Sequence, residues 1–273
     1  DTGMDNIGPF TFNAVRFFVG FLAITPLALL FEVKKFKSEL KLDLKTFLIL
    51  SFLIGISLFL GSALQQVALL YTDVANAAFF TIFYVPMVPI IIFLFRKKSI
   101  HWSVWPSVVL CLLGGYLLTN FQDATVRLGD TLVVLGALFW STHIIFTGII
   151  VTKYNLPLTI GAIQTLLVSL FSFLIGSIYE DFIYENILKE LNSILYAGIL
   201  SGGFAFVLQI YAQKNISPAP AAIIFSLEGV FATIAAWYLL NQILDINNIA
   251  GCFFILCGVL LSQLLPLFKN KYS

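Results

Sequence analysis

The sequence predicts an all-α, polytopic membrane protein, and three observations lead to this fold class. Of the 273 residues, 60% are hydrophobic and only 11% are charged, and the mean hydropathy is +0.99. A soluble domain carries about 25% charged residues and cannot bury so much apolar surface. Apolar runs of about 20 residues, the length that crosses a bilayer, recur from one end of the chain to the other. The function therefore takes place in or across a membrane.

Nine apolar runs are long enough to be transmembrane helices. The connections between them, such as 34–45, 96–101 and 123–130, are short and polar and leave no room for a soluble domain. In chain order, the nine predicted helices are 8–31, 46–71, 74–95, 101–121, 129–152, 157–179, 190–213, 217–240 and 246–268.

The basic residues predict the orientation of these helices. When the connections are assigned alternately to the two sides, twelve of the fifteen Lys and Arg residues fall on one side and two on the other, while Arg16 lies within a span. Cytoplasmic loops carry the excess of positive charge. We therefore expect a multi-pass protein of the plasma membrane, in bacteria the inner membrane, with a cytoplasmic C-terminus and Asp1 outside.

The chain also contains a weak internal repeat. A shift of 143 residues aligns Gly55 with Gly198 and Gly115 with Gly258, and a shift of 144 aligns Ala77 with Ala221. The predicted helices that begin at 46 and 190 enter the membrane from opposite sides, so the repeat is inverted. We expect one repeat over 1–121 and a second over 129–268. The first has one helix fewer, which predicts a further helix ahead of Asp1. Inverted repeats are typical of secondary transporters, whose substrate site lies near the membrane midplane between the repeats.

Several stretches resemble one family. GPFTFNAVRFFVG (8–20), VALLYTDVANAAFFTIFYVPMVPIIIFLF (67–95) and SPAPAAIIFSLEGVFATIAAWYLL (217–240) are similar to the EamA family of the drug/metabolite transporter superfamily. The resemblance spans essentially the whole chain. It implies ten helices in two inverted five-helix repeats, nine of them present here, and carriage of small metabolites such as amino acids or related compounds, often as export.

Two ionisable residues lie within the spans. Arg16 lies eight residues past Gly8, or about 12 Å deep, and Glu228 lies eleven residues past Ser217, or about 16 Å deep. A charge at the centre of a membrane helix costs roughly 2.5–3.5 kcal/mol on insertion scales. Two interpretations remain open. The residues are structural, as an ion pair with each other or with Arg16 snorkelling to the membrane surface, or they are functional, with ligand contact at Arg16 and proton coupling at Glu228. In the second, an anionic substrate on Arg16 would favour protonation of Glu228.

Other polar or kink-associated residues complete the predicted substrate site. Asn13 shares a helix face with Arg16, and Tyr84 lies beside Pro86, which together with Pro89 interrupts the helix 74–95. The remaining candidates, each of which can instead be a hydrogen-bonded packing residue, are Trp140, His143 and Gln164. With two histidines and three cysteines without a CxxC motif, we expect free thiols, no metal and no cofactor.

The leading hypothesis is a secondary-active carrier that works by alternating access. A carrier of drugs or one that flips lipids or other amphiphiles is the alternative on the same fold. HExxH and GxSxG are absent, which argues against an enzyme. The sequence also lacks a ring of like charges, which would indicate a channel. The expected partners are a small-molecule substrate and the lipid bilayer, without nucleic acid.

Overall fold

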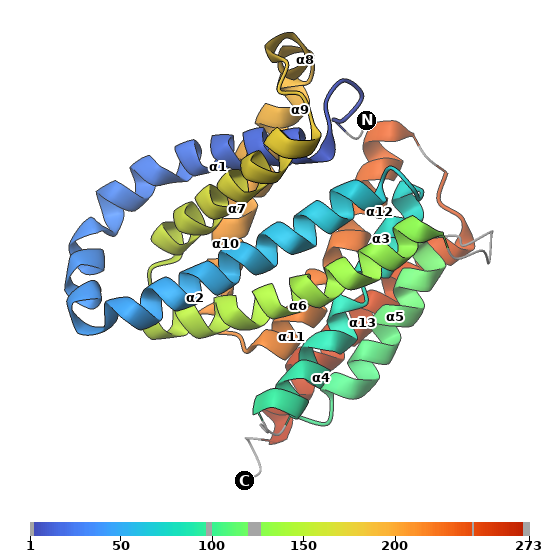
Figure 1. Cartoon of the computed structure of the whole chain (residues 1–273). Helices are drawn as coiled ribbons and strands as arrows, with labels where there is room; N and C mark the ends of the chain where they lie inside the picture. The colour runs from blue at the N-terminus through green and yellow to red at the C-terminus, as the bar shows by residue number, and fades with distance from the viewer. Residues whose placement is uncertain (1–2, 97–99, 120–126, 242, 270–273) are drawn as a thin grey trace. The chain divides into compact units, whose positions relative to one another are not determined.

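The structure, a computed structural model, describes residues 3–96, 100–119, 127–241 and 243–269. All regular elements in these ranges are helical, which confirms the predicted fold class. Figure 1 labels the α-helices α1 to α13, and a π-helix, η1, lies between α9 and α10. In chain order they are α1 Pro9–Phe31, α2 Val33–Ala68, α3 Val74–Thr81, α4 Tyr84–Arg96, α5 Val104–Leu118, α6 Leu128–Tyr154, α7 Pro157–Tyr179, α8 Tyr184–Lys189, α9 Leu191–Leu195, η1 (the π-helix) Tyr196–Ala205, α10 Phe206–Gln213, α11 Pro218–Phe225, α12 Leu227–Leu240 and α13 Ile246–Lys269.

The helices account for the predicted spans. In the described part of the chain, eight stretches are long and apolar enough to cross a membrane, and the ninth predicted span contains the shorter apolar helix α5. The protein is therefore an integral multi-pass membrane protein. Part of the predicted connection 96–101, the first half of 123–130 and the basic residues Lys97, Lys98 and Lys271 lie outside the described residues.

One predicted connection is not a loop. Residues 34–45 belong to α2, which runs from Val33 and has a single non-helical residue, Asp43, at φ −158° and ψ 63°. Phe36 explains part of this, because it packs against the buried core beneath it. The charged residues of the segment are also mostly good helix formers. The polarity of 34–45 marks the end of the apolar span, but the prediction that the helix stops there was wrong.

The chain divides into two compact units. The first contains residues Asp1–Gln66 and Phe146–Ile216, and the second contains Val67–Ile145 and Ser217–Ser273. Each unit combines segments from both halves of the sequence. The division therefore differs from that of the two sequence repeats.

The first unit is built on the pair α1 and α7, which lie side by side (Figure 1). Glu32, at the C-terminal end of α1, accepts hydrogen bonds from the backbone N–H groups of Leu158 and Thr159, at 3.0 and 2.8 Å. At the other end, Glu180 accepts from the N–H groups of Phe10 and Thr11, at 2.9 and 2.7 Å. The two helices are therefore antiparallel, and the C-terminal carboxylate of each caps the other's N-terminus.

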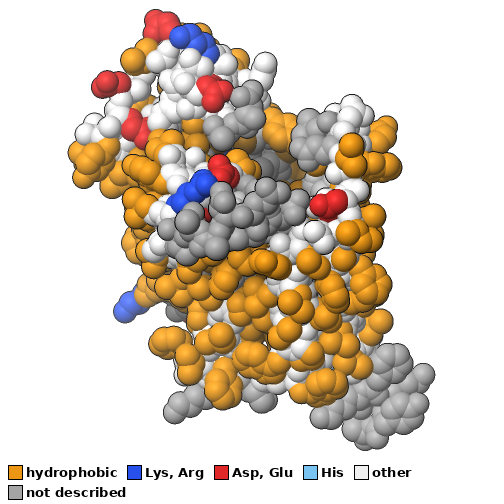
Figure 2. Space-filling view, turned by 90° about the vertical axis from the view of Figure 1, so that its right-hand side faces the viewer, with side chains coloured by type: hydrophobic (Ala, Val, Ile, Leu, Met, Phe, Trp, Pro, Cys, Tyr) orange, Lys and Arg blue, Asp and Glu red, His pale blue; other side chains and the backbone are white. Residues whose placement is uncertain are grey.

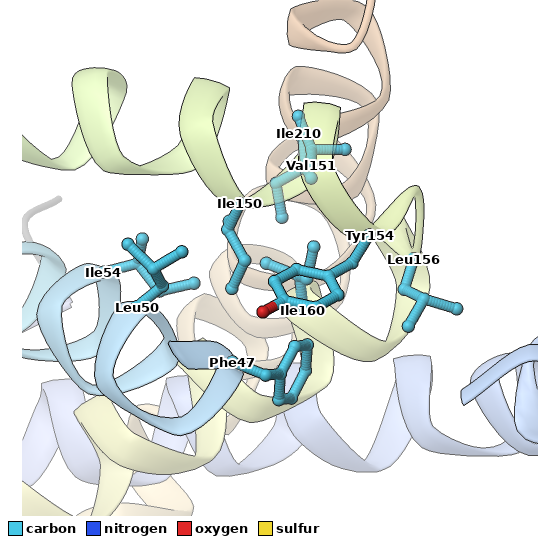
Figure 3. Close-up of a cluster of buried hydrophobic side chains, with 9 residues drawn as sticks. All are labelled: Phe47, Leu50, Ile54, Ile150, Val151, Tyr154, Leu156, Ile160 and Ile210. Carbon is cyan, nitrogen blue, oxygen red and sulfur yellow. The ribbon is translucent and has the colours of Figure 1, made fainter. Parts of the chain in front are cut away.

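A hydrophobic cluster fills the other side of the first unit. Figure 3 shows its side chains, which come from α2, α6, α7 and α10 and from Leu156 between α6 and α7. The ring of Tyr154 stands edge-on to that of Phe47, with centroids 5.1 Å apart. The salt bridge between Lys153 and Asp43, at 2.6 Å, closes the cluster where α2 bends. The members of the cluster are Phe47, Leu50, Ile54, Ile150, Val151, Tyr154, Leu156, Ile160 and Ile210.

The second unit is built on α5 and α13, which pack closely along their length. A Cβ atom added at Gly114 would lie 2.6 Å from the backbone oxygen of Gly251, and one added at Gly251 would lie 2.7 Å from that of Gly114. A Cβ at Gly258 would lie 2.9 Å from the backbone oxygen of Ser107. Glycine at these positions lets the two backbones approach, as at other membrane helix interfaces.

The surface fits a lipid environment. Figure 2 shows many hydrophobic side chains, and few charged ones, on the surface of the described residues on that face. Large apolar side chains such as Phe93, Leu174 and Phe253 are more than half exposed. Lipid tails cover such side chains without the cost that water would impose.

Candidate functional site

The first cluster of candidate residues lies on α1, in the first unit. Asn13 is fully buried, and its Oδ1 accepts a hydrogen bond from Arg16 Nε at 2.9 Å. The guanidinium carbon of Arg16 lies 5.1 Å from the ring centre of Phe12 and 4.9 Å from that of Phe17. The structure therefore brings Asn13 and Arg16 together, as predicted, and places two aromatic rings beside the positive charge.

A close backbone contact positions this turn of α1. A Cβ atom added at Gly198 of η1 would lie 2.6 Å from the backbone oxygen of Arg16, and one at Gly20 would lie 3.0 Å from that of Gly198. The two helices therefore touch backbone to backbone beside Arg16. Small residues such as these glycines let two helix backbones approach closely.

Gln164 occupies the matching place on α7. Arg16 and Gln164 are each the eighth residue counted from the proline that begins the helix, Pro9 or Pro157, and their numbers differ by 148. Glu32 and Glu180 also differ by 148 positions. The two capping glutamates and the pair Arg16 and Gln164 are therefore related by the same shift between two antiparallel helices. Gln164 is fully buried in α7.

The second cluster lies where two helices of the second unit are interrupted. The segment 74–96 breaks at Ile82 and Phe83, between α3 and α4. Proline has no N–H, so Pro86 cannot donate to the oxygen of Ile82, which accepts instead from the N–H of Val85 at 2.9 Å. The predicted interruption is therefore present four residues before Pro86, whereas α4 continues through Pro89.

The other interruption contains no proline. The segment 218–240 breaks at Ser226, between α11 and α12. The Ser226 hydroxyl donates to the oxygen of Ile223 at 2.6 Å and lies 3.4 Å from Cys111 Sγ. A serine that bonds back to its own helix competes with the helical pattern, which suits a break.

Tyr84 and Glu228 follow these two breaks at equivalent places. Tyr84 begins α4, Glu228 lies in the first turn of α12, and their numbers differ by 144, one of the shifts that aligns the sequence repeats. The Tyr84 hydroxyl and the Glu228 carboxylate are close enough to interact. The hydroxyl does not, however, reach the geometry of a full hydrogen bond. Tyr84 is buried and Glu228 is exposed.

Glu228 also benefits from its helix. The first N–H groups of a helix have no intrahelical acceptor, and the helix dipole is positive there, so a carboxylate in the first turn is stabilised. Half-helix termini exposed by a break inside a span carry out the same role at transporter ion and substrate sites. The start of α12 therefore gives the Glu228 carboxylate a favourable electrostatic environment.

Trp140 and His143 lie on α6, next to the start of α4. Ser141 Oγ lies 3.4 Å from the backbone oxygen of Tyr84, which fixes this neighbourhood. His143 is fully buried, and its ring stands perpendicular to that of Trp140 with centroids 6.1 Å apart. In the described residues, no group of three or more His, Cys, Asp or Glu side chains could hold a metal ion.

Comparison with known proteins shows the family of the chain. The sequence model of the EamA-like transporter family matches the chain twice, over residues 1–120 and 127–264. The chain belongs to the EamA family. This EamA protein is 30% identical to an uncharacterized transporter of Archaeoglobus fulgidus, over 96% of this chain and 79% of that protein. It is 25% identical to the uncharacterized transporter YoaV of Bacillus subtilis, over 95% of this chain and 89% of YoaV.

A solved crystal structure shares the fold of this EamA chain. It superposes with a TM-score of 0.79 over 100% of this chain and 92% of its own, at 16% sequence identity. At that identity the likeness concerns the fold alone. The family and the relatives' descriptions make this chain a membrane transporter of the drug/metabolite superfamily, and they agree with the expectation that it is not an enzyme.

Proposed function

We propose that this EamA transporter is a secondary-active carrier that exports small metabolites, amino acids or related compounds, by alternating access. The single observation that carries the proposal is the pair of interrupted helices in the second unit, with Tyr84 and Glu228 at matching positions after the breaks. Interrupted helices with ionisable groups at their exposed ends are a recurrent feature of secondary transporters. They also supply places where a helix can bend during a change of access.

We further propose that Glu228 takes up and releases the proton that drives the cycle. A carboxylate within a span is costly unless it has a function or a partner. Glu228 is exposed rather than sealed in packing, and the interaction that the described residues give it is with the Tyr84 phenol. The phenol can donate a hydrogen bond to the carboxylate while the carboxylate is charged, and it can rotate away once the carboxylate is protonated. Proton binding would thus alter the contact between two half-helices.

The experiment uses everted membrane vesicles from cells that produce the protein. With the vesicle interior acidified, a proton-driven exporter concentrates its substrate inside, and a protonophore collapses the gradient. We expect this for at least one labelled amino acid or related metabolite, relative to vesicles without the protein. Equal accumulation in both preparations for every compound would contradict the proposal. Movement of a labelled phospholipid instead would favour a lipid-flipping carrier.

A further inference from the structure

The cluster on α1 offers hydrogen-bond donors without matching acceptors. Asn13 is fully buried, its Oδ1 is used by Arg16 Nε, and its Nδ2 has no acceptor in the described part of the chain. Arg16 is half-buried, and its two terminal nitrogens, Nη1 and Nη2, form no hydrogen bond or salt bridge with the described residues. Three donor groups within a membrane span therefore have no acceptor among the described residues.

The neighbouring groups orient these donors. The bond to Asn13 Oδ1 fixes the Nε edge of the guanidinium, and the rings of Phe12 and Phe17 lie within 5.1 Å of its central carbon. Cation–π contact stabilises the positive charge but leaves the N–H groups in the guanidinium plane unused. The edge that carries Nη1 and Nη2 is thus the one available to another molecule.

An acceptor-only group would satisfy all three donors. A buried polar group without a partner is costly, so native structures rarely keep one unless water, an ion or a ligand serves it. A carboxylate has no donor and accepts through two oxygens. Its geometry matches paired guanidinium N–H groups better than a point charge does.

We propose that Arg16 and Asn13 bind the carboxylate of the transported substrate, with its two oxygens on Nη1 and Nη2 and one of them also on Asn13 Nδ2. The substrate class is then a small metabolite with a free carboxylate. The inference rests on the proposed function, because it treats this cluster as part of a carrier's substrate site.

The test measures the thermal stability of the purified protein in detergent with paired probes. Each standard L-amino acid and each of a set of small 2-oxo and 2-hydroxy acids is compared with its own carboxamide, which keeps the shape but replaces the acceptor-only group. We expect at least one acid to raise the melting temperature while its amide does not. If no acid does so, or if acids and amides stabilise equally, the assignment is wrong.

Two variants make the test specific to this cluster. Arg16→Lys keeps the charge but removes the paired donors, and we expect the acid to bind about tenfold more weakly. Asn13→Asp is nearly isosteric and supplies an internal carboxylate to Arg16, so it should fold and lose the acid response. Arg127→Lys, at an exposed salt bridge with Asp73, is the control and should match the parent. An Asn13→Asp protein that keeps the parent's acid response would overturn the proposal.

Transport separates this inference from the proposed function. If the protein exchanges a neutral or cationic compound saturably and Arg16→Lys leaves this exchange unchanged, the carboxylate site is contradicted and the carrier function is supported. If the protein binds an acid but does not exchange it across the membrane of liposomes, the carboxylate site is supported and the carrier function is contradicted.

Discussion

Glu32 and Glu180 make the same contact at opposite ends of the α1–α7 pair. Each carboxylate accepts two backbone N–H groups and one threonine hydroxyl, from Leu158 and Thr159 or from Phe10 and Thr11. Neither helix has a capping side chain of its own at its N-terminus. The two glutamates therefore supply the caps that the helices lack and bind them into one antiparallel pair.

Removal of either cap should destabilise the first unit. Glu180→Ala leaves three donors without their acceptor, and we expect a loss of about 1–2 kcal/mol, seen as a lower melting temperature in detergent. Glu32→Ala should cost at least as much, because Glu32 is more deeply buried. Glu185→Ala, at an exposed residue of α8, is the matched control. Equal melting temperatures for Glu180→Ala and Glu185→Ala would show that the caps carry little stability.

The contact between η1 and α1 gives a second prediction. In Gly198→Ala the new Cβ would lie 2.6 Å from the backbone oxygen of Arg16, so one helix must move. We expect a loss of about 1–3 kcal/mol, typical of overpacking, together with weaker transport because the displaced turn carries Arg16. Gly202→Ala is the control on the same helix, since its Cβ would meet no atom closer than 3.4 Å. Equal stability and transport in the two variants would mean that the backbone contact does not position Arg16.

Glu228 gives a third prediction. Glu228→Gln keeps the shape of the side chain but cannot take up a proton, so it should abolish accumulation driven by a pH gradient while exchange without a gradient continues. Tyr84→Phe, which removes only the phenol oxygen that faces Glu228, should shift the pH dependence of transport and keep the coupling. The measurement is uptake into proteoliposomes with and without an imposed gradient.

The outcomes for Glu228→Gln separate coupling from structure. If the variant accumulates substrate against its gradient like the parent, Glu228 is not the coupling group. If it instead unfolds while Tyr84→Phe remains stable and active, the carboxylate stabilises the start of α12 rather than the transport cycle.

The sequence predicts the helices of this protein better than their contacts. Span positions follow from the length of apolar runs, and the break near Pro86 follows from a missing N–H group. The break at Ser226 contains no proline, and no pattern in the sequence predicted it. The hydrogen bonds of Glu32 and Glu180 join residues more than a hundred positions apart. The polarity of the sequence predicts that a helix ends near each glutamate, but it does not predict which helix the glutamate caps.

The candidate site divides in the same way. Arg16 and Glu228 stand out in the sequence because charge within a span is rare. The orientation of Asn13, whose amide oxygen faces Arg16 and whose Nδ2 is left over, depends on side-chain geometry that spacing cannot give. Nor could the sequence show that the Tyr84 hydroxyl lies near the Glu228 carboxylate, although the 144-residue shift aligned their helices.

Counterflow in proteoliposomes tests the carrier assignment most directly. Liposomes loaded with an unlabelled carboxylate metabolite are diluted into the same compound in labelled form, at equal pH inside and outside. A carrier predicts transient accumulation of label that saturates with concentration and disappears when the interior is empty. Label entry that rises linearly with concentration, ignores the internal compound and accompanies an electrical conductance would contradict the account.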